Sequence, residues 1–142
     1  MNKYVLLKFF NMKTIVQSFF ALIFALLLIG CTSTNKSEPE FYVFKILTPV
    51  EWQQSQGKEY VVLSAIDQRG EFVHLAEAKN YQDIARRFSG GATEAIIVKL
   101  DPNKLAGDLV KETNPGDPTE YYHLYGGRIP MDAVVSSSVL TL

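Results

Sequence analysis

The chain has 142 residues, with 14 lysines and arginines against 15 aspartates and glutamates, and 47% of its residues are hydrophobic. A near-neutral balance without a basic patch excludes nucleic acid as the expected partner. Cys31 is the single cysteine, so no disulfide forms within the chain and the residue needs another explanation.

The first 30 residues have the layout of a secretory signal. Lys3, Lys8 and Lys13 are the only charges before Cys31, and an apolar stretch fills residues 15–29. As a helix, that stretch of about 15 residues would be about 22 Å long. A membrane span requires ~20 residues, so the stretch is short for one. Met12 is an alternative start, because Lys13 still follows it. The other interpretation is an uncleaved anchor with an incidental cysteine.

The run Leu28-Ile29-Gly30-Cys31 resembles the lipobox of bacterial lipoproteins. The resemblance implies diacylglyceryl transfer to Cys31, cleavage before it and acylation of the new amino terminus. Attached acyl chains would hold the protein on the membrane of the bacterial cell envelope. Thr32 stands where inner-membrane lipoproteins carry aspartate, which resembles the kind sorted to the outer membrane, facing the periplasm.

Three regions follow from this interpretation: a lipoprotein signal peptide at 1–30, a flexible tether at 31–40 and a single α+β domain at 41–142. The tether is polar, contains a proline and shows no apolar periodicity. Three of the 14 basic residues and none of the 15 acidic residues precede Cys31, so the mature chain carries 11 against 15, near −4. A negative domain is not drawn to anionic lipid by its own charge.

The domain reads as an α+β sequence of short elements. Aromatic, β-branched or alternating segments predict strands at 41–47, 60–64, 71–75, 95–100 and 134–142, with a further candidate at 109–112. Residues 67–70 are predicted as a turn and 114–118 as a loop, and the aromatic run 121–127 is expected to break at paired glycines. A turn of helix is expected at 129–133.

Two main helices are predicted, one between the first and second strands and one after the third. Thr48, Pro49 and Glu51 supply an N-cap, a proline at the first position and a capping-box acid for a helix that continues to Gln56. Asn80 is expected to cap the second helix, in which apolar residues recur at helical spacing as far as Phe88.

His74 and His123 are the only histidines and the first candidates for chemistry. Histidine is suited to proton transfer near neutral pH. On a strand, His74 points away from Val73 and Leu75, so it faces a cleft if they face the core. The alternative is that each histidine only bonds to neighbouring groups. Two histidines on separate segments without a thiol do not form a zinc pattern.

The tyrosines around His123 are the remaining ligand-binding candidates. Tyr121, Tyr122 and Tyr125 could stack on a planar ligand, or they pack in the fold. Neither a nucleophile elbow nor a phosphate-binding glycine loop is present in the sequence.

Several motifs in order resemble a bacterial family of about 100 residues that carries only a domain-of-unknown-function label. They are Phe41-Tyr42-Val43-Phe44-Lys45-Ile46, Trp52, Gly70-Glu71-Phe72-Val73-His74-Leu75, the helix to Phe88, Val98-Lys99-Leu100-Asp101 and Tyr122-His123-Leu124-Tyr125-Gly126. The family is thought to be distantly similar to the ADP-ribosyltransferase fold, a small split, curved, mostly antiparallel sheet with NAD in its cleft. The resemblance implies that Lys45, His74 and His123, with Tyr125 beside them, lie near one groove. Ala76 and Tyr122 depart from the family's serine and proline.

Two functions from different classes remain open. The preferred one is a non-catalytic, ligand-binding or accessory envelope lipoprotein, with a small molecule as its ligand and no cofactor. The alternative is an enzyme that acts on a nucleotide-like or ADP-ribosyl substrate through His74 and His123, with an NAD-like nucleotide in the groove. Ala76 has lost a hydroxyl that could orient a ribose, and no glutamate is placed by a matching motif. NAD is also scarce outside the cytoplasm.

Overall fold

The computed structural model describes residues 38–142. The signal peptide, the lipidation of Cys31 and most of the tether lie outside the described residues and stay predictions. Within residues 38–142 none of the helices is both long and apolar enough to span a membrane.

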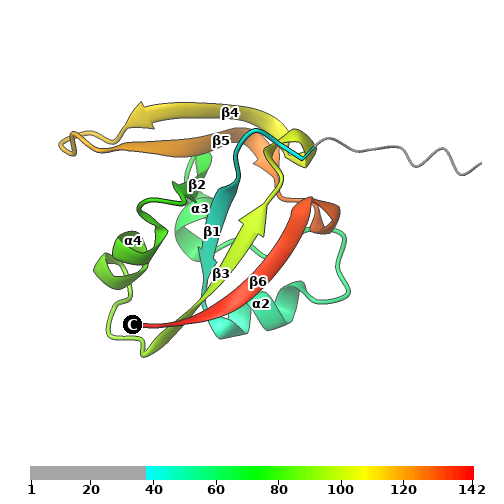
Figure 1. Cartoon of the computed structure of the whole chain (residues 1–142), viewed down its shortest axis with the longest axis horizontal. Coiled ribbons are helices and arrows are strands. Elements are labelled where there is room, and N and C mark those ends of the chain that lie inside the picture. The colour runs from blue at the N-terminus through cyan, green and yellow to red at the C-terminus, as the bar shows by residue number, and fades with distance from the viewer. Residues whose placement is uncertain (1–37) are drawn as a thin grey trace, which may run out of the picture. The chain divides into compact units, whose positions relative to one another are not determined.

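The domain is built on one six-stranded antiparallel sheet with the order β4-β5-β2-β1-β3-β6 (Figure 1). The strands are β1 (Val43–Leu47), β2 (Phe72–Glu77), β3 (Glu94–Leu100), β4 (Ala106–Thr113), β5 (Glu120–Arg128) and β6 (Val134–Thr141). Three α-helices, α2 (Pro49–Ser55), α3 (Ala65–Arg69) and α4 (Tyr81–Arg87), accompany short 3₁₀ turns at Pro102–Lys104 and Met131–Ala133. The predicted α+β class with two main helices is confirmed.

The sheet is weakly joined in its middle, between β1 and β2. These strands pair only where Val43 lies opposite Glu77 and Phe44 lies opposite Ala76. By contrast, β1 pairs with β3 along its whole length, and β2 pairs with β5 from Phe72 to Leu75. Beyond Phe44 and Ala76 the two halves of the sheet diverge, and this opening is where the site forms.

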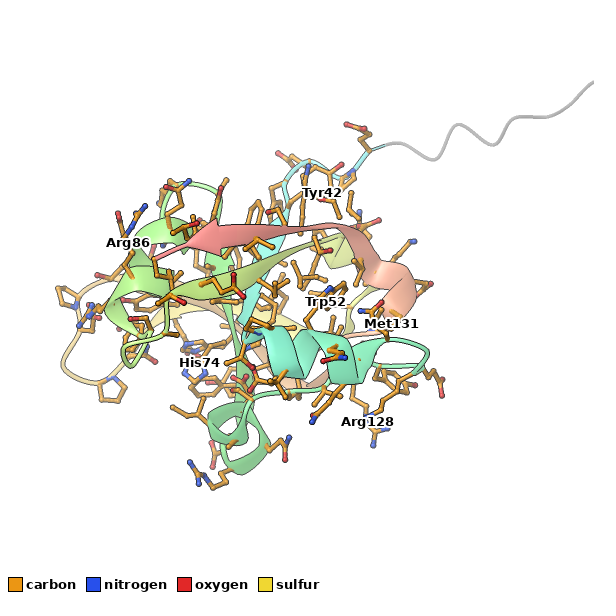
Figure 2. All side chains as sticks on the ribbon, turned by 90° about the horizontal axis from the view of Figure 1, so that it is seen from below. Tyr42, Trp52, His74, Arg86, Arg128 and Met131 are labelled. Atoms are coloured by element: carbon orange, nitrogen blue, oxygen red, sulfur yellow. The ribbon has the colours of Figure 1, made fainter. Side chains whose placement is uncertain are left out.

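The two main helices pack on opposite faces of the sheet. Trp52 of α2 contacts the larger core, and Figure 2 shows its side chain pointing from α2 toward the sheet. Ala85 of α4 contacts the smaller cluster on the other face with Ala95 and Ile97 of β3. Because β3 is covered on both faces, it reads as a continuous apolar run, as predicted for a central strand.

The predicted capping box of α2 is confirmed, and Asn80 is the N-cap residue of α4 as predicted, but without a side-chain cap hydrogen bond. The Thr48 side chain accepts from the Glu51 backbone N–H at 3.2 Å, and the Glu51 carboxylate accepts from the Thr48 backbone N–H at 2.8 Å. The Asn80 carbonyl oxygen accepts from the Ile84 backbone N–H at 3.0 Å, but the Asn80 side chain makes no hydrogen bond to α4. Its side-chain oxygen accepts instead from the backbone N–H of Glu77, which closes the turn after β2.

Two further predictions for the segment between α2 and β2 are wrong. Residues 60–64 do not form a strand, because only Tyr60 makes an isolated bridge, to Pro130. Residues 67–70 are not a simple turn: Asp67 lies inside the helix α3, whose N-cap is Ser64. A five-residue helix offers too little apolar periodicity to be distinguished from a turn in the sequence.

The paired glycines in β5 also behave differently from the prediction. The strand does not break at Gly126 and Gly127 but continues to Arg128. A Cβ on Gly127 would collide with the Ala106 carbonyl oxygen of β4 and with the Leu124 side chain. The missing side chain therefore allows β4 and β5 to approach closely, and glycine within a strand often marks such a close approach of another backbone.

Candidate functional site

A cleft of about 480 Å³ opens where β1 and β2 diverge. Its walls come from β1, β2, the beginnings of α2 and β3, α3, α4 and the end of the β4–β5 hairpin. Lys45, Ser64, Asp67 and His74 form its polar end, and Phe44, Ile46, Ile66, Ala76, Ile84 and Phe88 are among its apolar lining. Figure 2 shows His74 of β2 near the beginning of α2.

Asp67 is the centre of the polar end, and its side chain is fully buried. Its Oδ2 atom accepts from Lys45 Nζ at 2.5 Å and from Ser64 Oγ at 2.6 Å. Its Oδ1 atom accepts from the His74 backbone N–H at 3.0 Å and lies 3.0 Å from His74 Nδ1. The carboxylate therefore ties together β1, α3 and β2.

Local sequence explains how these groups meet. Ser64 caps α3 by accepting from the Asp67 backbone N–H, which fixes the third residue of the helix beside the cap. Lys45 lies on β1 just past the last residue that pairs with β2, so its ammonium can enter the opening. There Nζ also donates to the His74 carbonyl oxygen at 3.1 Å. That contact satisfies a backbone group left free by the diverging strands.

The Asp67 carboxylate stays ionised in this environment. Burial alone would raise its pKa, but the hydrogen bond from His74 and the charge and hydrogen bond of Lys45 outweigh burial. With the Ser64 hydroxyl added, the net effect lowers the pKa of Asp67 far below its ordinary value. Lys45 and Asp67 thus form a buried ion pair, with side chains 5% and 0% exposed.

An ionised Asp67 requires a proton on the His74 nitrogen that faces it. A carboxylate can only accept, so His74 Nδ1 carries the proton and donates it to Asp67. Nε2 is then left free for another partner, and the side chain is 38% exposed at the wall of the cleft. Val73 and Leu75 are 3% exposed in the core. The predicted orientation of His74, away from these two residues and into a cleft, is confirmed.

His123, like His74, contacts a carboxylate oxygen through Nδ1, but it is buried. It lies opposite His74 in the β2–β5 pairing, and its residue is 1% exposed. His123 Nδ1 lies 2.8 Å from Glu112 Oε1, which also accepts from the Tyr125 hydroxyl at 2.5 Å. The hydrogen bonds from Tyr125 and then His123 lower the pKa of Glu112. His123 Nε2 has no hydrogen-bond partner among the described residues.

The two imidazoles are close, but only one of them reaches the cleft. Their ring centroids are 5.4 Å apart in an edge-on arrangement. Phe72 stacks on the His123 ring at 3.8 Å and lies edge-on to His74 at 4.9 Å. The structure therefore brings Lys45 and His74 together at the cleft wall, while His123 and Tyr125 support that wall from outside the lining.

Sequence reasoning missed Ser64, Asp67 and Glu112. Ser64 and Asp67 have the spacing of an N-cap followed by an acid at the third helical position, and this signal predicts the beginning of α3 better than the strand at 60–64 and the turn at 67–70 do. No motif in the sequence singles out Glu112. Its position on β4, two strands from His74, has no signature in the sequence.

In the part of the chain that the structure describes, no three histidine, cysteine or acidic side chains gather in a way that could hold a metal ion.

Comparison with known proteins places the domain in a family. The family model described as "Protein of unknown function (DUF952)" matches residues 46–137, well over half of the chain. The chain belongs to the DUF952 family. The resemblance to a domain-of-unknown-function family is thereby confirmed, while the likeness to lipoproteins and to ADP-ribosyltransferases stays a prediction.

Solved structures similar to this DUF952 domain come from protein CC0527 of Caulobacter crescentus. Its crystal structure has a TM-score of 0.61 and 25% identity, covering 71% of this chain and 87% of that one. Its solution NMR structure has a TM-score of 0.59 and 25% identity, covering 71% and 85%. No curated protein matches the chain significantly.

Proposed function

We propose that this DUF952 domain binds one small molecule in the cleft beside His74, without covalent chemistry, while the protein is anchored at the bacterial cell envelope. One observation carries the binding proposal: an imidazole with a fixed orientation lies at the wall of a mostly apolar cleft. Ligand sites in proteins typically combine such an apolar cavity with a few fixed polar groups.

The free energy needed to bury the charged groups at the polar end of the cleft supports a ligand-binding role. Burying Lys45 and Asp67 requires both to lose water, and an apolar pair of similar size is often as stable or more stable. Local features that cost stability are expected where a protein binds or reacts. Here the ion pair serves to hold His74 Nδ1, which leaves Nε2 for a ligand.

Two substitutions at exposed helix positions test whether the cleft is the binding site. Ile66 lines the cleft and is 62% exposed, and Val50 lies outside the lining and is 60% exposed. Ile66→Trp should therefore obstruct the cleft at little cost in stability, and Val50→Trp is the matched control. A thermal-shift screen of the full chain against small molecules, with NAD, ADP-ribose and nucleotides included, gives the readout. Hits that survive Ile66→Trp unchanged would place binding elsewhere and refute the proposal.

A second candidate is an enzyme that acts on a nucleotide-like or ADP-ribosyl substrate. The Asp67–His74 pair favours it, because a carboxylate that orients the far nitrogen of an imidazole is the usual way to prepare a general base. Ala76, which lines the cleft, weighs against it because alanine has no hydroxyl that could orient a ribose. Incubating the full chain with NAD or ADP-ribose and following products by NMR tests it. Turnover that His74→Gln abolishes would replace the binding proposal with this one.

Anchoring at the envelope is the other half of the proposal. It rests on the Leu28-Ile29-Gly30-Cys31 run after an apolar stretch, and on the polar segment that separates this run from the domain. We expect Cys31→Ser to leave the domain folded but to remove it from the membrane fraction of cells, because two or more acyl chains are needed for stable attachment. Unchanged sedimentation with membranes, or a native protein with an intact leader and a free thiol in mass spectrometry, would refute it.

A further inference from the structure

The walls of the cleft carry more negative than positive charge. Among the described residues that line it, Lys45 is the single lysine or arginine, and Asp67 neutralises it at 2.5 Å. Glu51 and Glu94 add two further carboxylates to the same walls. The lining thus offers no unpaired lysine or arginine to a phosphate or a carboxylate. An anionic ligand would also have to approach two acids.

Cations beside the cleft do not change this balance. Arg87 lies next to Phe88 at the end of α4, with its guanidinium 5.2 Å from the centre of that ring. The same guanidinium is paired with Asp117 at 3.2 Å. Arg86 is 3.7 Å from Asp83 and points to solvent with about half of its side chain exposed. Both arginines are outside the lining.

The apolar part of the lining includes side chains that solvent reaches freely. Phe88 is 66% exposed and Ile66 is 62% exposed, although both are large and hydrophobic. Phe88 is the C-cap residue of α4 and Ile66 lies on α3, and Phe44 and Ile46 of β1 line the same cleft. A flat apolar ligand would cover these exposed surfaces at about 25 cal/mol per Å² of apolar area.

The polar group that such a ligand needs is set by His74. With Nδ1 donating to Asp67, a neutral ring presents the Nε2 lone pair and accepts a hydrogen bond. An N–H donor on the ligand satisfies it, and a positive charge on that donor is also favoured by Glu51 and Glu94. Aromatic faces such as Phe44 attract cations in addition.

We propose that the cleft selects flat, apolar compounds that bear an amine or a similar N–H donor, and that it rejects phosphates and carboxylates. This inference rests on the proposed binding function and gives it a ligand class. It points away from nucleotides, which carry the opposite charge.

A pair of probes of similar shape and opposite charge tests the ligand class: tryptamine, an amine, and indole-3-acetate, a carboxylate. Inorganic phosphate, AMP and ADP-ribose extend the anionic series. Because the chain has two histidines, labelling histidine with ¹³C at Cε1 gives two imidazole signals. His74→Gln removes one signal and thereby assigns both. Titrations use the full chain in lipid nanodiscs at neutral pH, and empty nanodiscs correct for partitioning into lipid.

We expect tryptamine to shift the His74 signal with saturation and indole-3-acetate to leave it unchanged. Ile66→Trp should abolish the tryptamine response, whereas Val50→Trp should retain it. Glu94→Gln should weaken tryptamine binding by about two- to fivefold, because Glu94 is exposed and one exposed charge interaction is small. Glu59→Gln, an exposed acid outside the lining, is the matched control and should change nothing.

The failures of the ligand class and of the binding function are distinguishable. A saturable His74 shift with AMP, ADP-ribose or indole-3-acetate, lost in Ile66→Trp, would overturn the ligand class and keep the cleft as a binding site. If none of the probes moves the signal and the small-molecule screen is also blank, both the ligand class and the binding function are refuted.

Discussion

The buried ion pair between Lys45 and Asp67 gives the most specific prediction for stability. Lys45→Met leaves Asp67 with its remaining hydrogen-bond donors, Ser64 and His74, but without a positive partner in a fully buried position. Removing one partner of such a pair costs about 3–5 kcal/mol. That is a large share of the roughly 5–15 kcal/mol by which domains are stable.

A double-mutant cycle separates the pair from the general cost of each substitution. Asp67→Asn should also destabilise the domain, since it leaves the ammonium of Lys45 buried without a counter-charge. In the double variant Lys45→Met/Asp67→Asn neither charge remains. The double variant should therefore lose much less unfolding free energy than the sum of the losses of the two single variants. The difference, a coupling of more than ~1 kcal/mol, is larger than exposed pairs give.

Urea unfolding measures the free energy of unfolding of all four proteins of the cycle. The readout is the fluorescence of Trp52, the single tryptophan, which packs against the core. Lys79→Met is the control, because Lys79 pairs with Glu77 at 3.0 Å but its side chain is 74% exposed. Its cost should stay within ~0–1 kcal/mol. A Lys45–Asp67 coupling as small as that of an exposed pair would refute the picture of a buried network that orients His74.

Three other outcomes are expected. Because the pKa of Asp67 is lowered in the folded state, its stabilising effect is complete above the ordinary carboxyl pKa near ~4 and is lost as the pH falls below that value. Asp67→Asn should therefore flatten the acid side of a plot of unfolding free energy against pH, and an unchanged slope would contradict this. Gly127→Ala should destabilise the domain by at least ~1–3 kcal/mol through collision with Ala106 and Leu124. Gly116→Ala should cost less, because its added Cβ meets nothing within 4 Å and only the backbone strain of its positive φ (+81°) remains. Equal midpoints in urea would contradict the close approach of β4 and β5. Glu112→Gln should lower stability and change the His123 imidazole signal, because Glu112 contacts His123 Nδ1. Tryptamine should still saturate the His74 signal, since Glu112 does not line the cleft. Loss of tryptamine binding would show that His123 acts on the ligand directly.

Local chemistry in the sequence was sufficient for much of the fold. Thr48, Pro49 and Glu51 predicted the beginning of α2, because a capping box is complete within four residues. The apolar run at 95–100 predicted a strand buried on both faces, and alternation around His74 predicted which way its side chain points. The family was also indicated by motifs in order, and the match over residues 46–137 confirmed it.

The tertiary structure decided the features that depend on segments far apart in the chain. Lys45, Asp67 and His74 meet because β1 and β2 stop pairing after Phe44, and no local pattern encodes the place where two strands diverge. Pairing of β2 with β5 put His123 next to His74 but inside the wall, which chain order alone does not determine. Side-chain chemistry along the sequence specified a histidine able to face a ligand; the long-range pairing of strands decided which carboxylate orients it and which charges surround the cleft.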